Sequence, residues 1–494
     1  MPRHAQTIFG ARLRQHASNP QAPAAIAMPG RTVTYAELVD EVDACAAWLL
    51  REGCAPSDLV GVTIADEVSH LVASLALLDL GIPQVCLPTH DHALARLRLA
   101  QRLSVNRILV ADVRHGLDGI ATLALTPDAP RVAPSDRPPD RSSDNPDSTA
   151  IYFTSSGTTG EPKVVALSQR LMSTRARRLG ECQSFTPDER VLMAVPVESY
   201  PAKTTRLYCL YLGVTSVLPA GTATAARPVL DLCTRLNVTC LELTVLQALG
   251  IVQEGAGAGQ LPGGTKTFVG GSRVPALLRD SLRARIGPQV FVNYGAQEVW
   301  RIASTYPNDP RPDLESVGPP FPWVELEIVD DDGKALPAGE VGEVRARSEC
   351  MIHEYHGDPV GTLRHFRDGW FYPGDLGALS PDGSLCIHGR KDDRMSLNSI
   401  KIFPAEIERA LEEHPAVRAA AAFAKASATH GDIPIAAVEL HASATVGVDE
   451  LMACARERLG VRAPRKIIVV DALPRNAAGK ISKHELVGLV VPDK

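Results

Sequence analysis

Apolar residues recur in two different rhythms along the first half of the chain. Residues 37–50 and 70–80 carry them at helical spacing, whereas residues 58–64 form a short apolar run of the kind found in a buried strand. The same mixture continues through residues 191–219 and 238–249. Helices alternating with buried strands indicate a layered α/β domain with a largely parallel sheet.

The pattern changes after residue 316. Residues 324–329 and 342–347 alternate apolar and polar positions with a period of two, and Asp331-Asp332-Gly333 between them is a typical turn sequence. Strict alternation on both sides of a turn predicts antiparallel strands. We therefore expect a small β-barrel-like unit within the N-terminal domain.

A further change of pattern follows residue 392. The segment that begins at Pro404 is amphipathic as far as Glu412, and residues 449–459 again have helical spacing. Between them, residues 417–424 and 435–440 form strand-like runs. The sequence thus predicts an α/β protein with a large N-terminal domain of layered α/β subdomains, residues 1–391, hinged to a small α+β C-terminal domain, residues 392–494.

Composition narrows the classes of function. A chain of 494 residues is long enough for two or three domains, and 51 basic against 57 acidic residues offer no electrostatic basis for binding nucleic acid or an anionic membrane. No apolar run reaches the roughly 18 residues of a membrane-spanning helix, and no secretory signal is evident. The ten cysteines lack metal-like spacing, so we expect small buried side chains. These features predict a reduced, cytoplasmic enzyme.

A stretch of small and hydroxyl-bearing residues separates two predicted strands, residues 149–153 and 163–167. Residues 155–163 contain four hydroxyl side chains, two glycines and Lys163. Exposed N–H groups and hydroxyls on such a loop form a concave anion site, which suits a polyphosphate; a simple surface turn is the alternative. The stretch lacks the G-x-x-x-x-G-K-[S/T] pattern and following helix of a Walker A loop, which argues against an ordinary P-loop ATPase.

Five further motifs follow in order along the chain. They are Asn293-Tyr294-Gly295-Ala296-Gln297-Glu298, Gly369-Trp370-Phe371-Tyr372-Pro373-Gly374-Asp375, Gly389-Arg390-Lys391-Asp392-Asp393, Pro404-Ala405-Glu406-Ile407-Glu408 and Pro474-Arg475-Asn476-Ala477-Ala478-Gly479-Lys480. With the 155–163 loop they resemble the adenylate-forming superfamily, which includes acyl-CoA synthetases, peptide-synthetase adenylation domains and beetle luciferases. The resemblance extends from residues 34–38 to Lys480, nearly the whole chain.

This resemblance implies a binding site for ATP. The loop would hold the β- and γ-phosphates through its hydroxyls and its lysine; its matching residues are Ser155, Ser156, Gly157, Thr158, Thr159, Gly160 and Lys163. Tyr294 would stack on adenine. Asp375 would accept hydrogen bonds from both ribose hydroxyls, and Arg390 would contact the ribose or phosphate.

The resemblance also implies catalytic groups. Gln297 would lie at the α-phosphate, where the family usually has Thr or Ser, and Glu298 would hold Mg²⁺. Lys480 would bridge the carboxylate and the phosphate while the adenylate forms, because a mobile cation suits developing negative charge. The small domain is expected to rotate about Asp392 and so present a second face for thioester formation.

Other segments are expected to line the pocket for the acid. The candidates are Glu198, Ser199, Gly270, Gly271 and Ala296. Glu198 suggests a cationic or amino substrate, although a solvated loop carboxylate is the alternative. The acceptor side departs from the family: thiolating relatives have Lys-x-x-Gly-x-Arg/Lys after the hinge, whereas residues 396–401 place Ser396 and Ser399 at the lysine and glycine positions.

We therefore predict an AMP-forming acid–thiol ligase that uses ATP and Mg²⁺ to activate a small acyl or aryl acid and then transfers it to CoA. One alternative is a stand-alone adenylation enzyme that loads an acid or amino acid onto the phosphopantetheine of a carrier protein. Another is a degenerate, non-catalytic ATP-binding regulator, motivated by Gln297, Ser396 and Ser399. A luciferase-like oxygenase is a remote alternative, because nothing in the sequence indicates oxygen chemistry.

Overall fold

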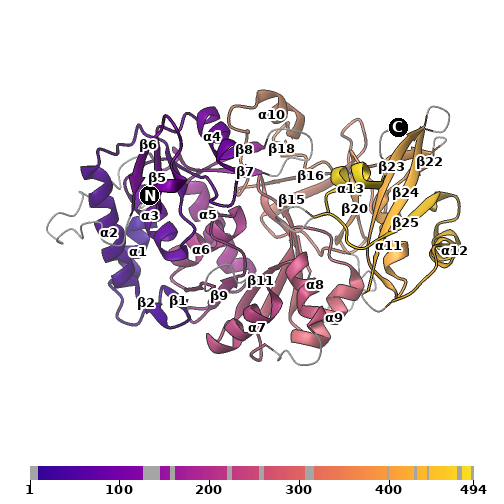
Figure 1. The fold of residues 1–494 in the computed structure, drawn as a ribbon, viewed down its shortest axis with the longest axis horizontal. Helices are drawn as coiled ribbons and strands as arrows, with labels where there is room; N and C mark the ends of the chain where they lie inside the picture. The colour runs from indigo at the N-terminus through magenta and orange to yellow at the C-terminus, as the bar shows by residue number, and fades with distance from the viewer. Residues whose placement is uncertain are drawn as a thin grey trace.

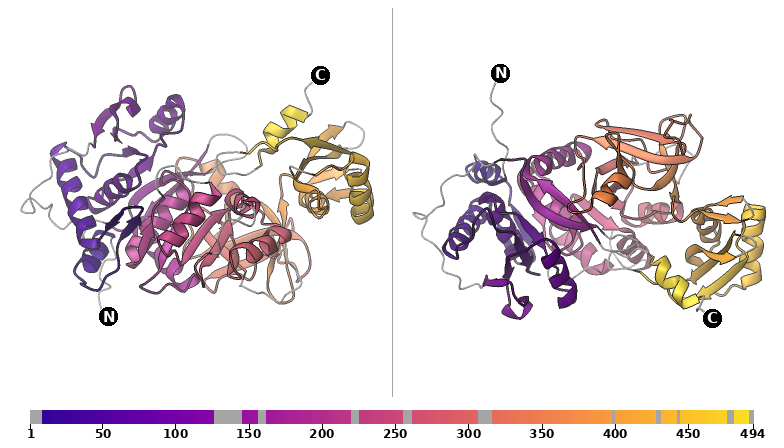
Figure 2. Two further views of the ribbon diagram at one scale, coloured as in Figure 1. Left: turned by 60° about the horizontal axis from the view of Figure 1, so that its bottom comes forward. Right: turned by 90° about the horizontal axis from the view of Figure 1, so that it is seen from above.

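The computed structural model describes residues 9–125, 145–155, 162–219, 225–254, 261–305, 316–397, 400–427, 431–441, 444–475 and 481–490. The molecule is elongated, with the N-terminal helices near one end of its long axis and the C-terminal strands at the other (Figure 1). The C-terminal unit stays at its own end when the molecule is turned (Figure 2).

The first sheet has the strand order β6-β5-β3-β4-β7-β8. Its members are β3 (Val60–Thr63), β4 (Gln84–Cys86), β5 (Arg107–Val110), β6 (Ala121–Ala124), β7 (Thr149–Ser155) and β8 (Lys163–Ser168). The strands from β6 to β7 pair in parallel, and β8 runs antiparallel to β7. The two strands predicted to flank the hydroxyl-rich loop are therefore neighbours in one sheet.

The second sheet has eight strands in the order β14-β13-β12-β11-β9-β10-β1-β2. They are β1 (Ile26–Met28), β2 (Arg31–Val33), β9 (Arg190–Met193), β10 (Thr215–Val217), β11 (Cys240–Thr244), β12 (Lys266–Gly270), β13 (Val290–Ala296) and β14 (Trp300–Ser304). The inner pairings are parallel, while β2 and β14 at the edges are antiparallel to their neighbours. The predicted largely parallel arrangement is confirmed.

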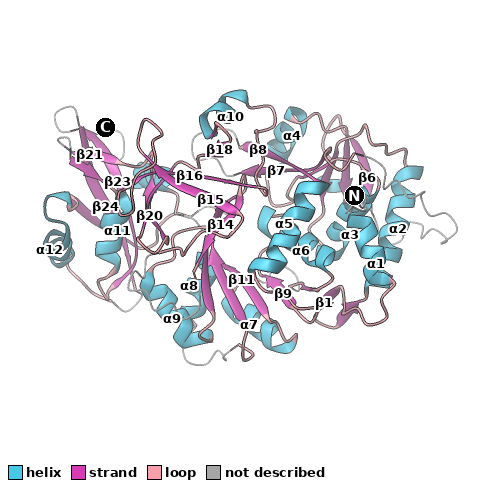
Figure 3. Ribbon diagram, turned by 180° about the vertical axis from the view of Figure 1, so that it is seen from behind, coloured by secondary structure: helices cyan, strands magenta, loops and turns pink. Residues whose placement is uncertain are grey.

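A layer of helices lies between these two sheets. It consists of α1 (Phe9–Ala17), α2 (Tyr35–Arg51), α3 (Glu67–Asp79), α5 (Gln169–Cys182) and α6 (Tyr200–Leu212). Their apolar faces and those of both sheets form one large buried cluster, and the helices are grouped together in Figure 3. Thr34 and Glu37 form a capping box that starts α2, which satisfies backbone N–H groups in the first turn.

Further helices cover the outer faces. They are α4 (Ala93–Arg102), η1 (Val113–His115), α7 (Ala226–Arg235), α8 (Val245–Gln253) and α9 (Ala276–Ile286). Apolar residues of α7, α8 and α9 pack with those of the second sheet, and residues of α4 pack with those of the first. The N-terminal region is therefore layered, as its alternating pattern predicted.

A third, antiparallel sheet follows in the sequence. It contains β15 (Val324–Val329), β16 (Gly342–Ser348), β17 (Phe366–Arg367), β18 (Trp370–Phe371), β19 (Asp375–Leu379) and β20 (Leu385–Arg390), with α10 (Pro359–His365) between β16 and β17. Strands β15 and β16 pair antiparallel, as their alternation predicted. This sheet brings Asp375 and Arg390 opposite each other, in the pairing of β19 with β20.

The C-terminal unit has its own sheet and core. Its elements are β21 (Met395–Leu397), β22 (Ile400–Ile402), α11 (Pro404–Glu412), β23 (Val417–Ser427), β24 (Gly431–Leu440), α12 (Val448–Leu459), η4 (Gly460–Arg462), β25 (Lys466–Val470) and α13 (Lys483–Val490). Two apolar clusters lie within it. Because β20 belongs to the third sheet and β21 to the fourth, we keep the division into residues 1–391 and 392–494 as our proposal.

The predicted fold class is confirmed: layered α/β subdomains and a small β unit precede a small α+β domain. No helix in the described part of the chain is both long and apolar enough to cross a bilayer. None of the ten cysteines forms a disulfide among the described residues; seven are buried, as expected for small apolar side chains, while Cys182, Cys386 and Cys454 are partly exposed.

Candidate functional site

The β7–β8 hairpin carries the predicted phosphate loop. Lys163 is the first residue of β8 and lies opposite Ser155, the last residue of β7. The intervening Ser156, Gly157, Thr158, Thr159 and Gly160 lie outside the described residues, so their contacts stay a prediction. The described part of the hairpin fixes where the loop leaves and rejoins the sheet.

The Lys163 side chain is held at two points. Its Nζ lies 2.7 Å from Nε2 of His365 and 4.8 Å from the centre of the Tyr355 ring. An ammonium over the face of an aromatic ring is attracted by the ring's quadrupole. Partial burial lowers the pKa of Lys163, although the Glu298 carboxylate opposes this effect.

The second ring nitrogen of His365 contacts a backbone carbonyl. It is the last residue of α10, and its Nδ1 lies 2.8 Å from the carbonyl oxygen of Tyr372. A carbonyl can only accept, so Nδ1 carries the proton and Nε2 is left to accept a hydrogen bond from the Lys163 ammonium. Burial lowers the pKa of His365, which favours this neutral form.

Glu298 lies on the other side of Tyr355. The Tyr355 hydroxyl donates a 2.7 Å hydrogen bond to Oε1 of Glu298, and both side chains are buried. Burial and this carboxylate raise the pKa of Tyr355, so it stays protonated and donates. A carboxylate oxygen is the hard ligand that Mg²⁺ prefers, which fits the role expected for Glu298.

Gln297 has one weak contact and one unsatisfied atom. Its Nε2 lies 3.5 Å from the carbonyl oxygen of Thr154, at the end of the phosphate hairpin. Its Oε1 is buried and has no hydrogen-bond partner among the described residues. An unpaired buried acceptor is costly, so this position suits a polar ligand beside the hairpin.

A buried arginine fixes the backbone of this motif. Arg175 of α5 is inaccessible to solvent, and its Nη2 donates to the carbonyl oxygens of Gln297 at 3.0 Å and Glu298 at 3.3 Å. Its Nε donates to the carbonyl of Cys350 at 2.9 Å, and its Nη1 donates to the Tyr200 hydroxyl at 3.0 Å. One guanidinium therefore joins four segments around Glu298.

The residues expected to bind the nucleoside contact one another. The Tyr294 hydroxyl donates to Oδ2 of Asp375 at 2.6 Å, and Arg390 Nη1 lies 3.2 Å from Oδ1 of the same carboxylate. Burial raises the pKa of Tyr294, so the phenol remains the donor. A carboxylate has about four lone-pair positions, so Asp375 can accept further hydrogen bonds from a diol.

Glu198 and Ser199, which were expected to line the acid pocket, form hydrogen bonds with other residues of the chain. Glu198 is 6% exposed, and its two carboxylate oxygens accept from the backbone N–H of Thr89 at 2.7 Å and from its hydroxyl at 2.8 Å. The Ser199 hydroxyl donates to the carbonyl of Pro196 at 2.7 Å. The solvated alternative for Glu198 therefore does not hold, and its carboxylate already has two donors.

The glycine pair and Ala296 lie at the ends of neighbouring strands. Gly270 ends β12, and a Cβ there would come within 3.0 Å of the Asn293 carbonyl oxygen. Gly271 has φ +87°, which favours glycine. Ala296 ends β13 and pairs with Trp300 of β14.

An irregular turn joins β13 to β14. Trp300 adopts φ +66°, and the strand register shifts between Tyr294 and Gly295. A side chain at Gly295 would collide with the Trp300 carbonyl oxygen. The bulge thus requires glycine at position 295 and places a partly exposed tryptophan two residues after Glu298.

Asp392, the expected hinge residue, pairs at 3.2 Å with Arg364, one residue before His365. Lys480 and Ser399 lie outside the described residues, so their roles stay predictions. Arg475 and Ile481, on either side of the Lys480 segment, form an isolated antiparallel bridge. The predicted catalytic segment therefore leaves and rejoins the C-terminal unit at one place.

Two contacts tie the C-terminal unit to the α8–α9 region. Arg273 Nη1 lies 2.5 Å from Oε2 of Glu412, and Arg418 donates to the side chain of Gln253 at 3.2 Å. Burial raises the pKa of Glu412, although the Arg273 charge opposes the shift. Because Arg273 follows the Gly270–Gly271 pair by two residues, this contact connects the expected acid pocket to the small domain.

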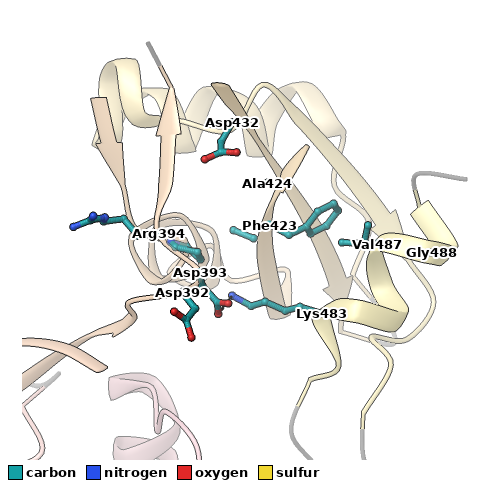
Figure 4. Close-up of a pocket in the computed structure, with 11 residues that line it drawn as sticks. Asp392, Asp393, Arg394, Phe423, Ala424, Asp432, Lys483, Val487 and Gly488 are labelled. Carbon is teal, nitrogen blue, oxygen red and sulfur yellow. Dashed lines mark ion pairs between the residues drawn. The ribbon is translucent and has the colours of Figure 1, made fainter. Parts of the chain in front are cut away.

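A cavity of about 640 Å³ lies within the C-terminal unit. Its lining residues are Asp392, Asp393, Arg394, Pro404, Ala422, Phe423, Ala424, Asp432, Lys483, Val487 and Gly488. The Lys483 side chain points toward Asp393, whose carboxylate lies 3.6 Å from its Nζ (Figure 4). None of the described residues around Lys163 or Glu298 lines this cavity, so it is separate from the candidate ATP site.

Three residues around Glu298 were not identified from the sequence: Arg175, Tyr355 and His365. Arg175 lies among other arginines of α5, and no local pattern distinguishes it. Tyr355 and His365 lie in the segment that precedes the Pro373-Gly374-Asp375 motif. That position was the only feature of the sequence that could have pointed to them. Their contacts with Lys163 and Glu298 depend on tertiary structure.

Two family models match most of the chain. A model of the AMP-binding enzyme family matches residues 13–356, and a model of the AMP-binding enzyme C-terminal domain matches residues 406–480. An indoleacetate–CoA ligase of Aromatoleum aromaticum is 26% identical, over 96% of this chain and 97% of that protein. A fatty acid–acyl-carrier-protein ligase of Streptomyces coeruleorubidus is 29% identical, over 95% and 94%.

Solved structures show the same fold over nearly the whole chain. The amide bond synthetase McbA from Marinactinospora thermotolerans gives a TM-score of 0.87 at 26% identity, covering 97% of this chain and 99% of that one. The o-succinylbenzoate CoA synthetase of Bacillus subtilis, in complex with its acyl-adenylate intermediate, gives 0.85 at 25% identity, covering 96% and 97%. The resemblance inferred from the sequence motifs is confirmed.

Proposed function

Because the chain belongs to the AMP-binding enzyme family, we propose that it activates a small acyl or aryl carboxylic acid with ATP and transfers the acyl group to the thiol of CoA. One observation carries the proposal: next to the phosphate hairpin, Lys163 lies over the ring of Tyr355 and Glu298 accepts a hydrogen bond from its hydroxyl. A cation for phosphates and a hard ligand for Mg²⁺ are the groups that this chemistry requires.

The first step joins two anions. A carboxylate oxygen of the acid attacks the α-phosphorus of ATP, the bond between the α-phosphorus and the bridging oxygen breaks, and pyrophosphate leaves. Lys163 is suited to bind the departing phosphates, and Glu298 to bind Mg²⁺, which supplies charge neutralisation when bound. Lys480 would contact the carboxylate and phosphate.

Asp375 would bind the nucleoside. Its carboxylate, held by Tyr294 and Arg390, would accept from the ribose hydroxyls. Gln297 can donate through its amide to the α-phosphate, at the position where the family usually has a hydroxyl. In the second step the acceptor attacks the acyl carbon, AMP leaves with the bonding electrons, and the acceptor's proton is released.

The acceptor has two further candidates. A carrier protein's phosphopantetheine would react as CoA does, and one relative is named as a ligase for such a carrier. An amine acceptor is favoured by a specific observation: Ser399 replaces the glycine that thiolating relatives keep, and a structural neighbour is named as an amide bond synthetase. An amide-forming enzyme has no pantetheine arm to accommodate at that position.

The proposal is tested by acid-dependent exchange of labelled pyrophosphate into ATP across aryl, short acyl and amino acids. Exchange with one class of acid, abolished in Lys163→Met, would support adenylation at this site. AMP release is then compared with CoA, a holo-carrier protein or amines as acceptor, which separates the candidates. Intact ATP binding without exchange across the whole panel would instead favour the non-catalytic regulator.

A further inference from the structure

Tyr355 contacts two side chains of opposite charge. Its hydroxyl donates to Oε1 of Glu298 at 2.7 Å, and its ring lies under the Lys163 ammonium at 4.8 Å. Glu298 is buried and Lys163 is partly buried, and attraction between opposite charges is stronger there than in water. A direct ion pair between Lys163 and Glu298 would occupy each group with the other.

The arrangement needs a second support, because a lysine side chain is long and flexible. His365 provides it by accepting from Lys163 Nζ at 2.7 Å, while its own Nδ1 donates to the Tyr372 carbonyl. The imidazole is therefore anchored to the backbone at one nitrogen and holds the ammonium with the other. Tyr355 and His365 together fix the position of Lys163.

We propose that His365 and Tyr355 are positioning residues that keep Lys163 from pairing with Glu298, so that the lysine stays free for phosphates and the carboxylate for a divalent cation. This rests on the proposed function, which assigns Lys163 and Glu298 those partners. These contacts favour ligand binding because they exist in the free protein. The site then does not have to break an ion pair between Lys163 and Glu298 before it binds ATP and Mg²⁺.

Other charges around the pair do not replace this support. Arg364 and Arg390 lie close enough to lower the pKa of Lys163, and Asp358 close enough to raise it. Arg364 is paired with Asp392, and Arg390 with Asp375. Each of these arginines thus has its own carboxylate, which leaves His365 and Tyr355 as the direct contacts of the Lys163 ammonium among the residues that the structure describes.

The first test compares three replacements of His365 by calorimetric titration with MgATP. In His365→Gln the amide oxygen can accept from Lys163 in place of Nε2, so affinity should stay within about threefold of wild type. His365→Ala has no acceptor, and the shorter amide of His365→Asn cannot reach the position of Nε2, so in both affinity should fall about tenfold, the effect of one hydrogen bond to a charged group. His356→Ala, an exposed histidine against the Tyr152 ring, should change nothing.

The pattern of rescue separates positioning from a structural role. A residue needed for packing alone would lose affinity equally in the glutamine and asparagine variants, in step with loss of stability on thermal unfolding. In the exchange assay, His365→Ala should raise the KM for ATP more than it lowers kcat, because the lysine is displaced and not removed. Equal affinity for MgATP in all three variants and wild type would overturn the proposal.

A second test needs no substrate. Nitrogen NMR of histidine-labelled protein without ligand should show His365 neutral at pH 7, with Nδ1 protonated and Nε2 bare. Lys163→Met removes the neighbouring cation and should raise the pKa of His365. An unchanged pKa, or the opposite tautomer, would overturn the contact itself. Failure of wild-type protein to bind MgATP would count against the proposed function and leave this measurement valid.

Discussion

Replacing Arg175 by methionine tests whether one buried guanidinium holds the Gln297–Glu298 backbone in place. Arg175 is 0% exposed and donates to three backbone carbonyls, those of Gln297, Glu298 and Cys350, and to the Tyr200 hydroxyl. Methionine occupies a similar space but donates nothing. The variant therefore removes the donors while leaving the apolar packing of α5 largely filled.

The size of the effect follows from the contacts. At about 1 kcal/mol for each buried acceptor that loses its partner, four acceptors amount to about 4 kcal/mol. Removing a buried cation from the folded state recovers part of this, because its desolvation no longer has to be offset. We expect the free energy of unfolding to fall by about 2 kcal/mol, and kcat of pyrophosphate exchange by about a hundredfold, since a shift of 1 Å at reacting groups has that effect.

Urea unfolding at constant pH and the exchange assay measure the two effects separately. Arg175→Lys keeps the charge but not the planar donors and should lie between methionine and wild type. Arg177→Met, on the exposed face of the same helix, is the matched control and should change neither quantity. If Arg175→Met unfolded at the wild-type urea concentration and kept its kcat, the positioning argument would be refuted.

Three further predictions concern other parts of the chain. Burial lowers the pKa of Lys203 to about 8, so in denaturant titrations the stability of wild type relative to Lys203→Met should rise by about 3 kcal/mol between pH 8 and 10.5. Glu412→Gln should weaken the contact with Arg273 and speed tryptic cleavage at Lys391 severalfold. Asp375→Asn should weaken MgATP binding at least tenfold by calorimetry, with unfolding within about 0.5 kcal/mol of wild type.

For each of these three predictions, a specific result would contradict the reasoning. The sign for Lys203 follows because between its two pKa values this side chain is protonated in the unfolded state and largely neutral in the folded state, so its own contribution to stability increases with pH. A stability difference between wild type and Lys203→Met that stayed constant over that range would contradict the buried, weakly basic lysine. Unchanged tryptic cleavage in Glu412→Gln would contradict a restraining role for the Arg273–Glu412 contact. Full affinity for MgATP in Asp375→Asn would contradict the role of Asp375 in nucleotide binding.

The hairpin that carries Lys163 was predictable from local sequence. Two runs rich in β-branched and aromatic residues flank a stretch of Ser, Thr and Gly, and the structure forms β7 and β8 in those positions. The same holds for α11, which begins at Pro404 and ends at Glu412 as the amphipathic pattern predicted. Elements with strong periodicity and clear end signals are specified by neighbours in the chain.

The support around Lys163 could not be predicted in this way. His365 contacts Lys163 across 202 positions of sequence, because the fold places the end of α10 beside the start of β8. Arg175 shares α5 with Arg170, Arg177 and Arg178, and its burial depends on where loops from distant segments cross the helix. Such contacts are set by tertiary packing, which no periodicity in the sequence encodes.

The left-handed backbone at Trp300 has a consequence for anyone who redesigns substrate preference. In a mutant library at this position, the backbone conformation would decide which variants fold before the size of the side chain could affect the pocket. β-Branched residues in particular are strongly disfavoured at φ +66°. Glycine and asparagine would be over-represented among folded variants for reasons unrelated to the acid. A useful library would hold Gly295 constant and score each variant for expression before activity.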